Sequence, residues 1–179
     1  LFEERVRCEM GRVFDLVIRT AISGWTTKNM RENLDWSILQ FDPDVVSIMI
    51  GMNDACDLSL EEFTDNYNAI LVDVAAKTKA QIILHTPNPV IPGLEPIREP
   101  NLPIFAERIR QIANNGGIPL VDHWEDWQQA WLANPFRAYA WMSDAIHPNV
   151  FGHRAFARHL MKSLGIWDSS SMCGKLHIL

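Results

Sequence analysis

Residues 45–54 read VVSIMIGMND, an apolar run that ends at a glycine and then turns polar. A nearly continuous apolar run of this length is typical of a strand covered on both faces, as in a parallel sheet. Gly51 ends the predicted strand, and Asn53 and Asp54 follow it directly. Ligands of such sheets bind beyond the carboxyl ends of the strands, so we expect chemistry at this position.

Strand and helix patterns alternate on both sides of this run. Further short strands are predicted at 13–19, 81–86 and 118–121, with helices at 1–10, 26–38, 59–74, 105–113 and 149–164. A loop over 87–103 holds six of the ten prolines and is expected to border a site. Strict alternation predicts an α/β fold, in which a parallel sheet carries helices on both faces.

Composition bounds the function. The chain has 179 residues, 47% of them hydrophobic, which suits one globular domain or a domain with a tail. A net charge of −6 without a Lys/Arg run argues against a nucleic-acid partner, which needs a basic face. No apolar stretch reaches the ~20 residues of a membrane span. Cys8, Cys56 and Cys173 are too scattered for a disulfide framework or a zinc site.

Asp144 and His147 lie three residues apart in a loop before the last predicted helix. At this spacing a carboxylate can accept a hydrogen bond from the imidazole Nδ1, which leaves Nε2 free as a general base. Pro148 restricts His147 to an extended backbone and helps to hold the loop. The alternative is that Asp144 caps a turn and that His147 is a surface residue.

Gly24 and Asn53 both follow predicted strands. The Asn53 amide and the bare Gly24 N–H could donate hydrogen bonds into one cleft, as an oxyanion hole requires. Each also has a plain structural interpretation, because Asn and Gly are common turn residues. Neither residue alone indicates a function.

Taken together and in this order, these segments resemble the SGNH hydrolases, also called the GDSL esterases and lipases. Residues 22–27 (ISGWTT) are similar to the second block of that family, and residues 51–54 (GMND) to its third. Residues 144–148 (DAIHP) are similar to the fifth, and they are followed by Asn149, Gly152 and His153. The resemblance runs from Leu1 to about Gly165.

The resemblance implies a fold and a set of roles. The fold would be a flavodoxin-like three-layer α/β/α sandwich with strand order 2-1-3-4-5. His147 would be the general base, Asp144 would orient it, and the Gly24 N–H and the Asn53 side chain would bind the oxyanion. This requires three distant loops to converge at one rim of the sheet.

The first block of the family, Gly-Asp-Ser, which carries the nucleophile, does not occur in the printed sequence. We therefore expect the first strand and the nucleophilic Ser to lie upstream of Leu1. Ser23, Ser47, Ser59 and Ser143 are poor replacements by their positions. The alternative is a catalytically inactive binding module or fragment. The predicted domain covers residues 1–167, and residues 168–179 form a tail.

The predicted activity is that of a serine esterase that cleaves carboxylic esters through an acyl-enzyme. We expect a small-molecule ester substrate, such as an acyl ester or an acetylated sugar, and no metal or organic cofactor. A soluble protein is expected, with the cytoplasm favoured, although a signal peptide could precede Leu1. Trp124, Trp127 and Trp131 lie at helical spacing and are expected to pack in the interior, with a wall for the substrate as the alternative.

Overall fold

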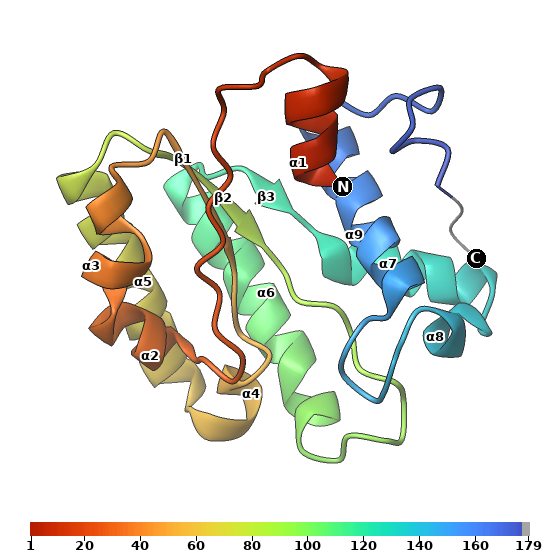
Figure 1. Cartoon of the computed structure of the whole chain (residues 1–179). Coiled ribbons are helices and arrows are strands. Elements are labelled where there is room, and N and C mark those ends of the chain that lie inside the picture. Colours follow the sequence, from red (N-terminus) through yellow and green to blue (C-terminus); the bar gives the residue numbers. More distant parts are fainter. Residues whose placement is uncertain (177–179) are drawn as a thin grey trace. The chain divides into compact units, whose positions relative to one another are not determined.

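The computed structural model describes residues 1–176 (Figure 1). The chain forms two compact units. We call Thr20–Trp124 the sheet unit, because it contains every strand of the described chain. We call Leu1–Arg19 together with the chain from Glu125 onward the terminal unit. The fold class is α/β with a parallel sheet, as predicted.

The sheet has three parallel strands in the order β1-β2-β3. Between the first two strands, the register runs from the pair Val45–Gln81 to the pair Met49–His85. Between the second and third strands, Leu84 pairs with Leu120. All three carboxyl ends therefore lie at one edge, where Thr86 Oγ1 donates to Asp122 Oδ1 at 2.9 Å. The strands are β1 (Val45–Met49), β2 (Gln81–His85) and β3 (Leu120–Val121).

Two long helices carry the crossovers between these strands. Their apolar stripes are buried, and Phe63 of α5 meets Phe105 of α6 with ring centroids 4.9 Å apart. Right-handed crossovers that advance in one direction place both helices on the same face of the sheet. The helices of the sheet unit are α2 (Thr27–Glu32), α3 (Leu34–Ser37), a 3₁₀ turn η2 (Leu39–Phe41), α4 (Asp54–Asp57), α5 (Leu60–Lys77) and α6 (Arg98–Gly116).

Local capping explains where these helices begin and end. The Ser59 hydroxyl accepts from the Glu62 N–H at 3.1 Å, as the sequence predicts for the start of α5. Gly117 ends α6 in the left-handed conformation with φ +61°. The start of α6 differs from the prediction, because the helix begins at Arg98 inside the proline-rich segment. Pro100 lies in the first turn, where its missing N–H would have no partner, whereas Pro103 lies inside the helix.

The burial of β1 also differs from the prediction. Val46 and Ile48 are buried, whereas Val45 and Met49 are 53% and 52% exposed. Successive side chains of a strand point to opposite faces, so one face of β1 is covered and the other is open. β1 is also an edge strand, paired only with β2 in the described chain.

The terminal unit is built around Trp127, which is fully buried. Its ring meets Trp131, Trp141 and Phe156 at centroid distances of 5.9, 5.1 and 4.9 Å. Interior packing is therefore the correct interpretation of Trp127. The helices of this unit are α1 (Phe2–Glu4), a π-helical turn η1 (Arg5–Glu9), α7 (His123–Ala133, which begins in the sheet unit), α8 (Arg137–Ala140) and α9 (Val150–Ser163).

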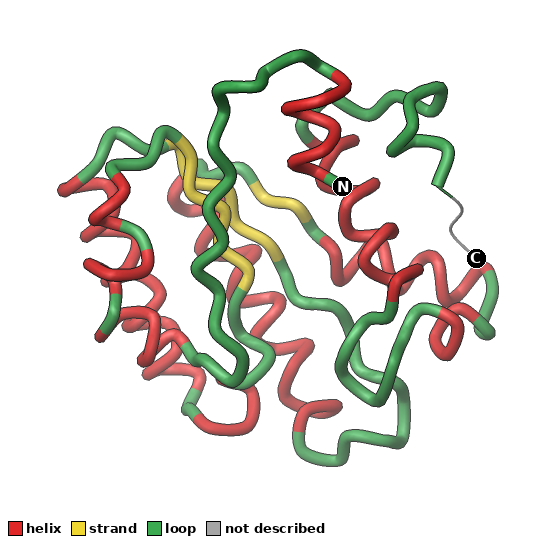
Figure 2. Tube along the Cα trace, viewed as in Figure 1, coloured by secondary structure: helices red, strands yellow, loops and turns green. Residues whose placement is uncertain are grey.

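The strand predicted at 13–19 does not form, and Figure 2 shows this segment as loop. Phe14 and Leu16 are 97% and 75% exposed. An extended apolar segment becomes a strand only where a neighbouring strand satisfies its backbone N–H and C=O groups. The described residues of the terminal unit contain no strand that could do so.

The two ends of the described chain meet within the terminal unit. The Arg5 Nε donates to the Ile166 carbonyl at 2.8 Å, and the Cys173 N–H donates to Glu9 Oε1 at 2.8 Å. The domain boundary at residue 167 stays a prediction. The last three residues of the predicted tail, 177–179, lie outside the described chain. Within residues 1–176, no helix combines the length and the apolar character needed to cross a membrane.

Candidate active site

Asn53 lies in the turn that follows β1. Gly51 precedes it with φ +126°, a backbone conformation that glycine adopts readily and other residues do not. Phe63 of α5 and Ile109 of α6 lie 3.6 Å from the position that a Gly51 Cβ would occupy, so the turn packs against these two helices. The sequence predicted this position correctly, because a strand that ends at Gly51 must deliver Asn53 to the carboxyl edge of the sheet.

Gly24 lies in the turn before α2, with φ +81° and open space around its Cα. The next residue, Trp25, accepts a hydrogen bond through its carbonyl oxygen from Asn53 Nδ2 at 3.1 Å. The structure thus brings together the two loops that carry the predicted oxyanion donors. A primary amide has two N–H bonds, so Asn53 can donate to Trp25 and still offer the other.

A second contact joins the same two loops. The Asp54 carboxylate oxygen Oδ1 accepts from the Thr27 backbone N–H at 2.8 Å and from the Thr27 hydroxyl at 2.5 Å. Both side chains are fully buried. Burial raises the pKa of Asp54 above its ordinary value, and the two Thr27 hydrogen bonds oppose this shift. Asp54 therefore has a structural role beneath the site, and it fixes the start of α2.

Asp144 and His147 contact each other in the terminal unit. The Asp144 Oδ2 lies 2.9 Å from His147 Nδ1, while Oδ1 accepts from the Ile146 N–H at 2.9 Å and from the His147 N–H at 2.8 Å. These hydrogen bonds, first from Ile146 and then from His147, lower the pKa of Asp144 to about 2. An ionised carboxylate can only accept, so Nδ1 carries the proton and Nε2 has the lone pair when the ring is neutral.

The loop around this pair is closed by backbone contacts. The Ser143 N–H donates to the His147 carbonyl at 2.7 Å, and Met142 forms a bridge with Pro148. Asn149 caps α9, because its Oδ1 accepts from the Phe151 N–H at 2.9 Å. The sequence predicted the helix start. It left the Asp–His contact open against a turn cap by Asp144 and a surface position for His147, and the structure shows the contact, the turn cap and a His147 side chain that is 65% exposed.

Three of the four serines considered as nucleophiles have structural partners. Ser47 Oγ lies 2.8 Å from His85 Nε2, Ser59 caps α5, and the Ser143 hydroxyl donates to the Pro148 carbonyl at 3.4 Å. Ser23 lies in the turn before Gly24. The upstream nucleophile accordingly stays a prediction.

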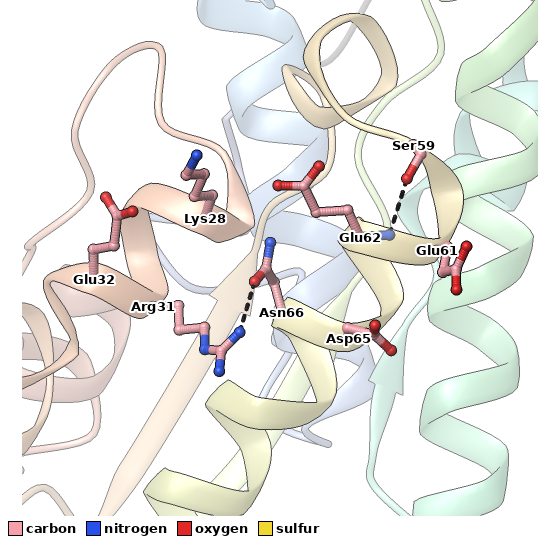
Figure 3. A pocket seen from close by; sticks show the side chains of 8 residues that line it. All are labelled: Lys28, Arg31, Glu32, Ser59, Glu61, Glu62, Asp65 and Asn66. Atoms are coloured by element: carbon pink, nitrogen blue, oxygen red, sulfur yellow. Dashed lines mark hydrogen bonds between the residues drawn. The ribbon is translucent and has the colours of Figure 1, made fainter.

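A polar cavity of about 690 Å³ opens between α2 and α5 in the sheet unit (Figure 3). Arg31 Nη1 donates to Asn66 Oδ1 at 3.1 Å across the two helices, and carboxylates of both helices also line the cavity. Charged groups of both signs line it, and none of the four predicted site residues does. The cavity is lined by Lys28, Arg31, Glu32, Ser59, Glu61, Glu62, Asp65 and Asn66.

Sequence reasoning missed Arg98, which lies in the segment predicted as a proline-rich loop. Its guanidinium reaches the Asn53 turn: Nε donates to the Met52 carbonyl at 3.2 Å, and Nη2 lies 3.5 Å from Asn53 Oδ1. No local pattern marks such a residue, because its partner lies 45 positions earlier in the chain. The sequence offered one indication of a residue such as Arg98, which was the expectation that the segment 87–103 borders a site.

Comparison with known proteins agrees with the fold. Residues 1–155 match the family described as the GDSL-like lipase/acylhydrolase family. An acetylxylan esterase from Geobacillus stearothermophilus is 31% identical over 161 residues, which cover 83% of this chain and 72% of that protein. The chain therefore belongs to the GDSL-like lipase/acylhydrolase family of ester hydrolases.

Solved structures show the same fold. The crystal structure of an acetylxylan esterase from G. stearothermophilus has a TM-score of 0.81 and 24% identity, covering 96% of this chain and 81% of that one. A protein described as a GDSL-like lipase from Parabacteroides merdae has a TM-score of 0.83 and 22% identity, covering 93% and 80%. Three further structures of the Geobacillus esterase are described as catalytic mutants, in which a histidine, a serine or an aspartate is replaced by alanine.

Proposed function

We propose that this protein is a serine esterase that removes acetyl groups from sugar esters through an acetyl-enzyme. His147 is the general base, Asp144 orients it, and the Gly24 N–H and the Asn53 Nδ2 stabilise the oxyanion. The observation that carries the proposal is the hydrogen bond between Asp144 Oδ2 and His147 Nδ1 at 2.9 Å. It supplies an imidazole in the tautomer that a general base needs.

The substrate class and the roles are supported by the relatives. The acetylxylan esterase resembles this chain over most of its length. In that enzyme the aspartate and histidine of the catalytic mutants lie three positions apart, which is the spacing of Asp144 and His147 here. The serine of the third mutant supports a serine nucleophile.

The nucleophile is proposed to be a serine upstream of Leu1. β1 has one edge without a strand partner in the described chain. A parallel strand added at that edge would end beside the turn that carries Asn53, because parallel strands share their carboxyl edge. A serine at the end of such a strand would lie next to an oxyanion donor.

The reaction then follows in two halves. His147 Nε2 accepts the serine proton as the hydroxyl oxygen attacks the acetyl carbonyl carbon. The oxyanion that forms accepts hydrogen bonds from the Gly24 backbone N–H and the Asn53 side-chain N–H. The intermediate collapses, the bond to the sugar oxygen breaks, and the protonated His147 gives that oxygen its proton. Water, deprotonated by His147, then attacks the acetyl carbonyl carbon; the bond to the serine oxygen breaks, His147 returns the proton to that oxygen, and acetate leaves. Asp144 is ionised at neutral pH and stabilises the imidazolium in both halves.

The test compares two forms of the protein. One is the printed 179 residues, and the other is the same chain with any residues that precede Leu1 in its gene. We expect the longer form to hydrolyse p-nitrophenyl acetate and acetylated xylo-oligosaccharides, and to be labelled by a fluorophosphonate. His147→Ala in the longer form should abolish both activities. A longer form that folds and binds such sugars without turnover would instead support the inactive binding module.

A further inference from the structure

The Asn53 side-chain amide is held from two sides. Its Nδ2 donates to the Trp25 carbonyl at 3.1 Å, and its Oδ1 lies 3.5 Å from Arg98 Nη2. Contacts at both ends of a planar amide fix its rotation. They leave one N–H bond of Nδ2 with a fixed direction, and that bond is the one available to a ligand.

Arg98 is itself held in place before it reaches Asn53. It is the first residue of α6, and its Nη1 pairs with Glu95 Oε2 at 2.9 Å. The Arg98 side chain is 19% exposed, so the pair is largely shielded from water. A second hydrogen bond runs from Nε to the Met52 carbonyl at 3.2 Å. The planar guanidinium thus contacts two groups at once, the Met52 carbonyl and the Asn53 side-chain oxygen. A lysine ammonium lacks this planar pair of donors.

A cation beside Oδ1 also changes the amide electronically. It draws electron density toward the oxygen, which makes the N–H bonds more positive and better hydrogen-bond donors. A donor that is fixed in advance costs no reorganisation when charge develops on a ligand oxygen. Both effects act on the group proposed to bind the oxyanion.

We propose that Arg98 is a positioning residue, which fixes and polarises the Asn53 amide for an oxyanion. This inference rests on the proposed esterase function for its catalytic consequence. The amide is held whether or not the protein is an esterase, so the two statements can fail separately.

The chain offers a matched control on the same helix. Arg108 of α6 also reaches a distant partner, because its Nη1 donates to Thr64 Oγ1 of α5 at 2.7 Å. That contact ties α6 to α5 and involves no residue of the proposed site. Arg108→Met therefore measures the loss of an α6 arginine that has no part in positioning Asn53.

The first experiment needs no activity. In the longer form, NMR follows the chemical shifts of the Asn53 side-chain amide, whose signals are assigned by their loss in Asn53→Ala. Arg98→Met should shift the Asn53 side-chain amide signals, because the cation beside Oδ1 is lost and the amide is no longer held, while Arg108→Met should leave them unchanged. Unchanged signals in a folded Arg98→Met variant would overturn the positioning role. Arg98→Lys provides a milder variant should the methionine variant fail to fold.

The second experiment measures acetyl-ester hydrolysis in the longer form. Arg98→Met and Arg98→Lys should lower kcat about tenfold and change KM less than twofold, because the oxyanion forms only in the transition state. In an Asn53→Ala background, Arg98→Met should lower kcat by less than a further twofold. A rise in KM alone, or an equal loss in that background, would overturn the proposal. If neither form of the protein hydrolyses the acetyl ester, the proposed esterase function is wrong. The NMR result still tests whether Arg98 positions the Asn53 amide.

Discussion

The Asp144 carboxylate contacts His147 twice, at its backbone N–H (2.8 Å) and at its ring Nδ1 (2.9 Å). One acidic side chain therefore sets both the backbone position and the tautomer of the histidine. Because a third hydrogen bond comes from the Ile146 N–H, the carboxylate is ionised far below neutral pH. The orientation of the imidazole does not depend on binding of a substrate.

This pair has a defined pH window. The pKa of Asp144 is lowered from 3.8 to about 2, so its contribution to stability is complete above about pH 4 and is lost as the pH falls through about 2. We expect the Asp144 carboxyl carbon to titrate in NMR with a midpoint near 2. Asp144→Asn removes this titration and should lower turnover of the longer form by orders of magnitude, because the imidazole loses its orientation. An Asp144 midpoint at 3.8 or above would contradict the three-point contact.

Asn53→Ala tests the oxyanion role in the longer form. Loss of one donor of this kind costs about a hundredfold or more in kcat, with little effect on KM. Asn101→Ala is the control, since the Asn101 amide donates to the Ala55 and Ile97 carbonyls at 3.1 Å and has no place in the proposed site. Steady-state kinetics with an acetyl ester measure both variants. Unchanged turnover in folded Asn53→Ala would remove Asn53 from the mechanism.

Asn149 is predicted to stabilise the loop that carries His147. Its Oδ1 caps α9, and its Nδ2 donates to the Ala140 and Met142 carbonyls at 2.8 and 3.1 Å. Asn149→Ala should lower the free energy of unfolding by about 2–3 kcal/mol, the sum of one cap and two hydrogen bonds. Asn149→Ser keeps a capping oxygen and should recover about 1 kcal/mol of that loss. Denaturant unfolding measures both, and equal losses would mean that the cap contributes nothing.

Gly152→Ala should destabilise the protein, although alanine is the better helix former by about 1 kcal/mol. A Cβ at Gly152 would lie 2.4 Å from the Trp141 carbonyl oxygen and 2.9 Å from the Trp127 ring. The backbone carbonyl cannot move aside without displacing α9, so we expect a net loss of about 2 kcal/mol. Ala157→Gly on the same helix should cost about 1 kcal/mol through propensity alone. A higher melting temperature for Gly152→Ala would show that the helix does not approach Trp141 this closely.

Two substitutions of Asp54 should change the stability of the protein in different ways. Asp54→Ala leaves the buried Thr27 N–H and hydroxyl without an acceptor, which should cost about 2–3 kcal/mol. Asp54→Asn keeps an acceptor oxygen and carries no charge. Because burial raises the pKa of Asp54, its stabilising effect is complete below about pH 3.8 and declines as the pH rises toward the raised pKa. Relative to wild type, Asp54→Asn should therefore gain stability from pH 3.5 to pH 7, as unfolding at the two pH values will show.

Local signals predicted much of the fold. Ser59, Asn149 and Gly117 mark helix ends correctly, because capping is decided by one side chain and the backbone within three residues of it. The apolar run that becomes β1 was equally clear. The segment at 13–19 is also mostly apolar but forms no strand, since pairing depends on a neighbour that the local sequence does not specify.

The same distinction separates the predicted and the missed site residues. Asp144 and His147 meet across three positions, a spacing from which contact could be named as a possibility. Arg98 meets Asn53, and Thr27 meets Asp54, across 45 and 27 positions. Neither contact can be read from local spacing, because each joins segments that lie far apart in the sequence.

The unpaired side of β1 has a consequence for handling the protein. A flat parallel strand whose N–H and C=O groups face outward, with Val45 and Met49 half exposed beside them, is a template for intermolecular β-pairing. The printed chain alone should therefore self-associate and aggregate with increasing concentration, and a strand that covers this edge would act as its intramolecular chaperone.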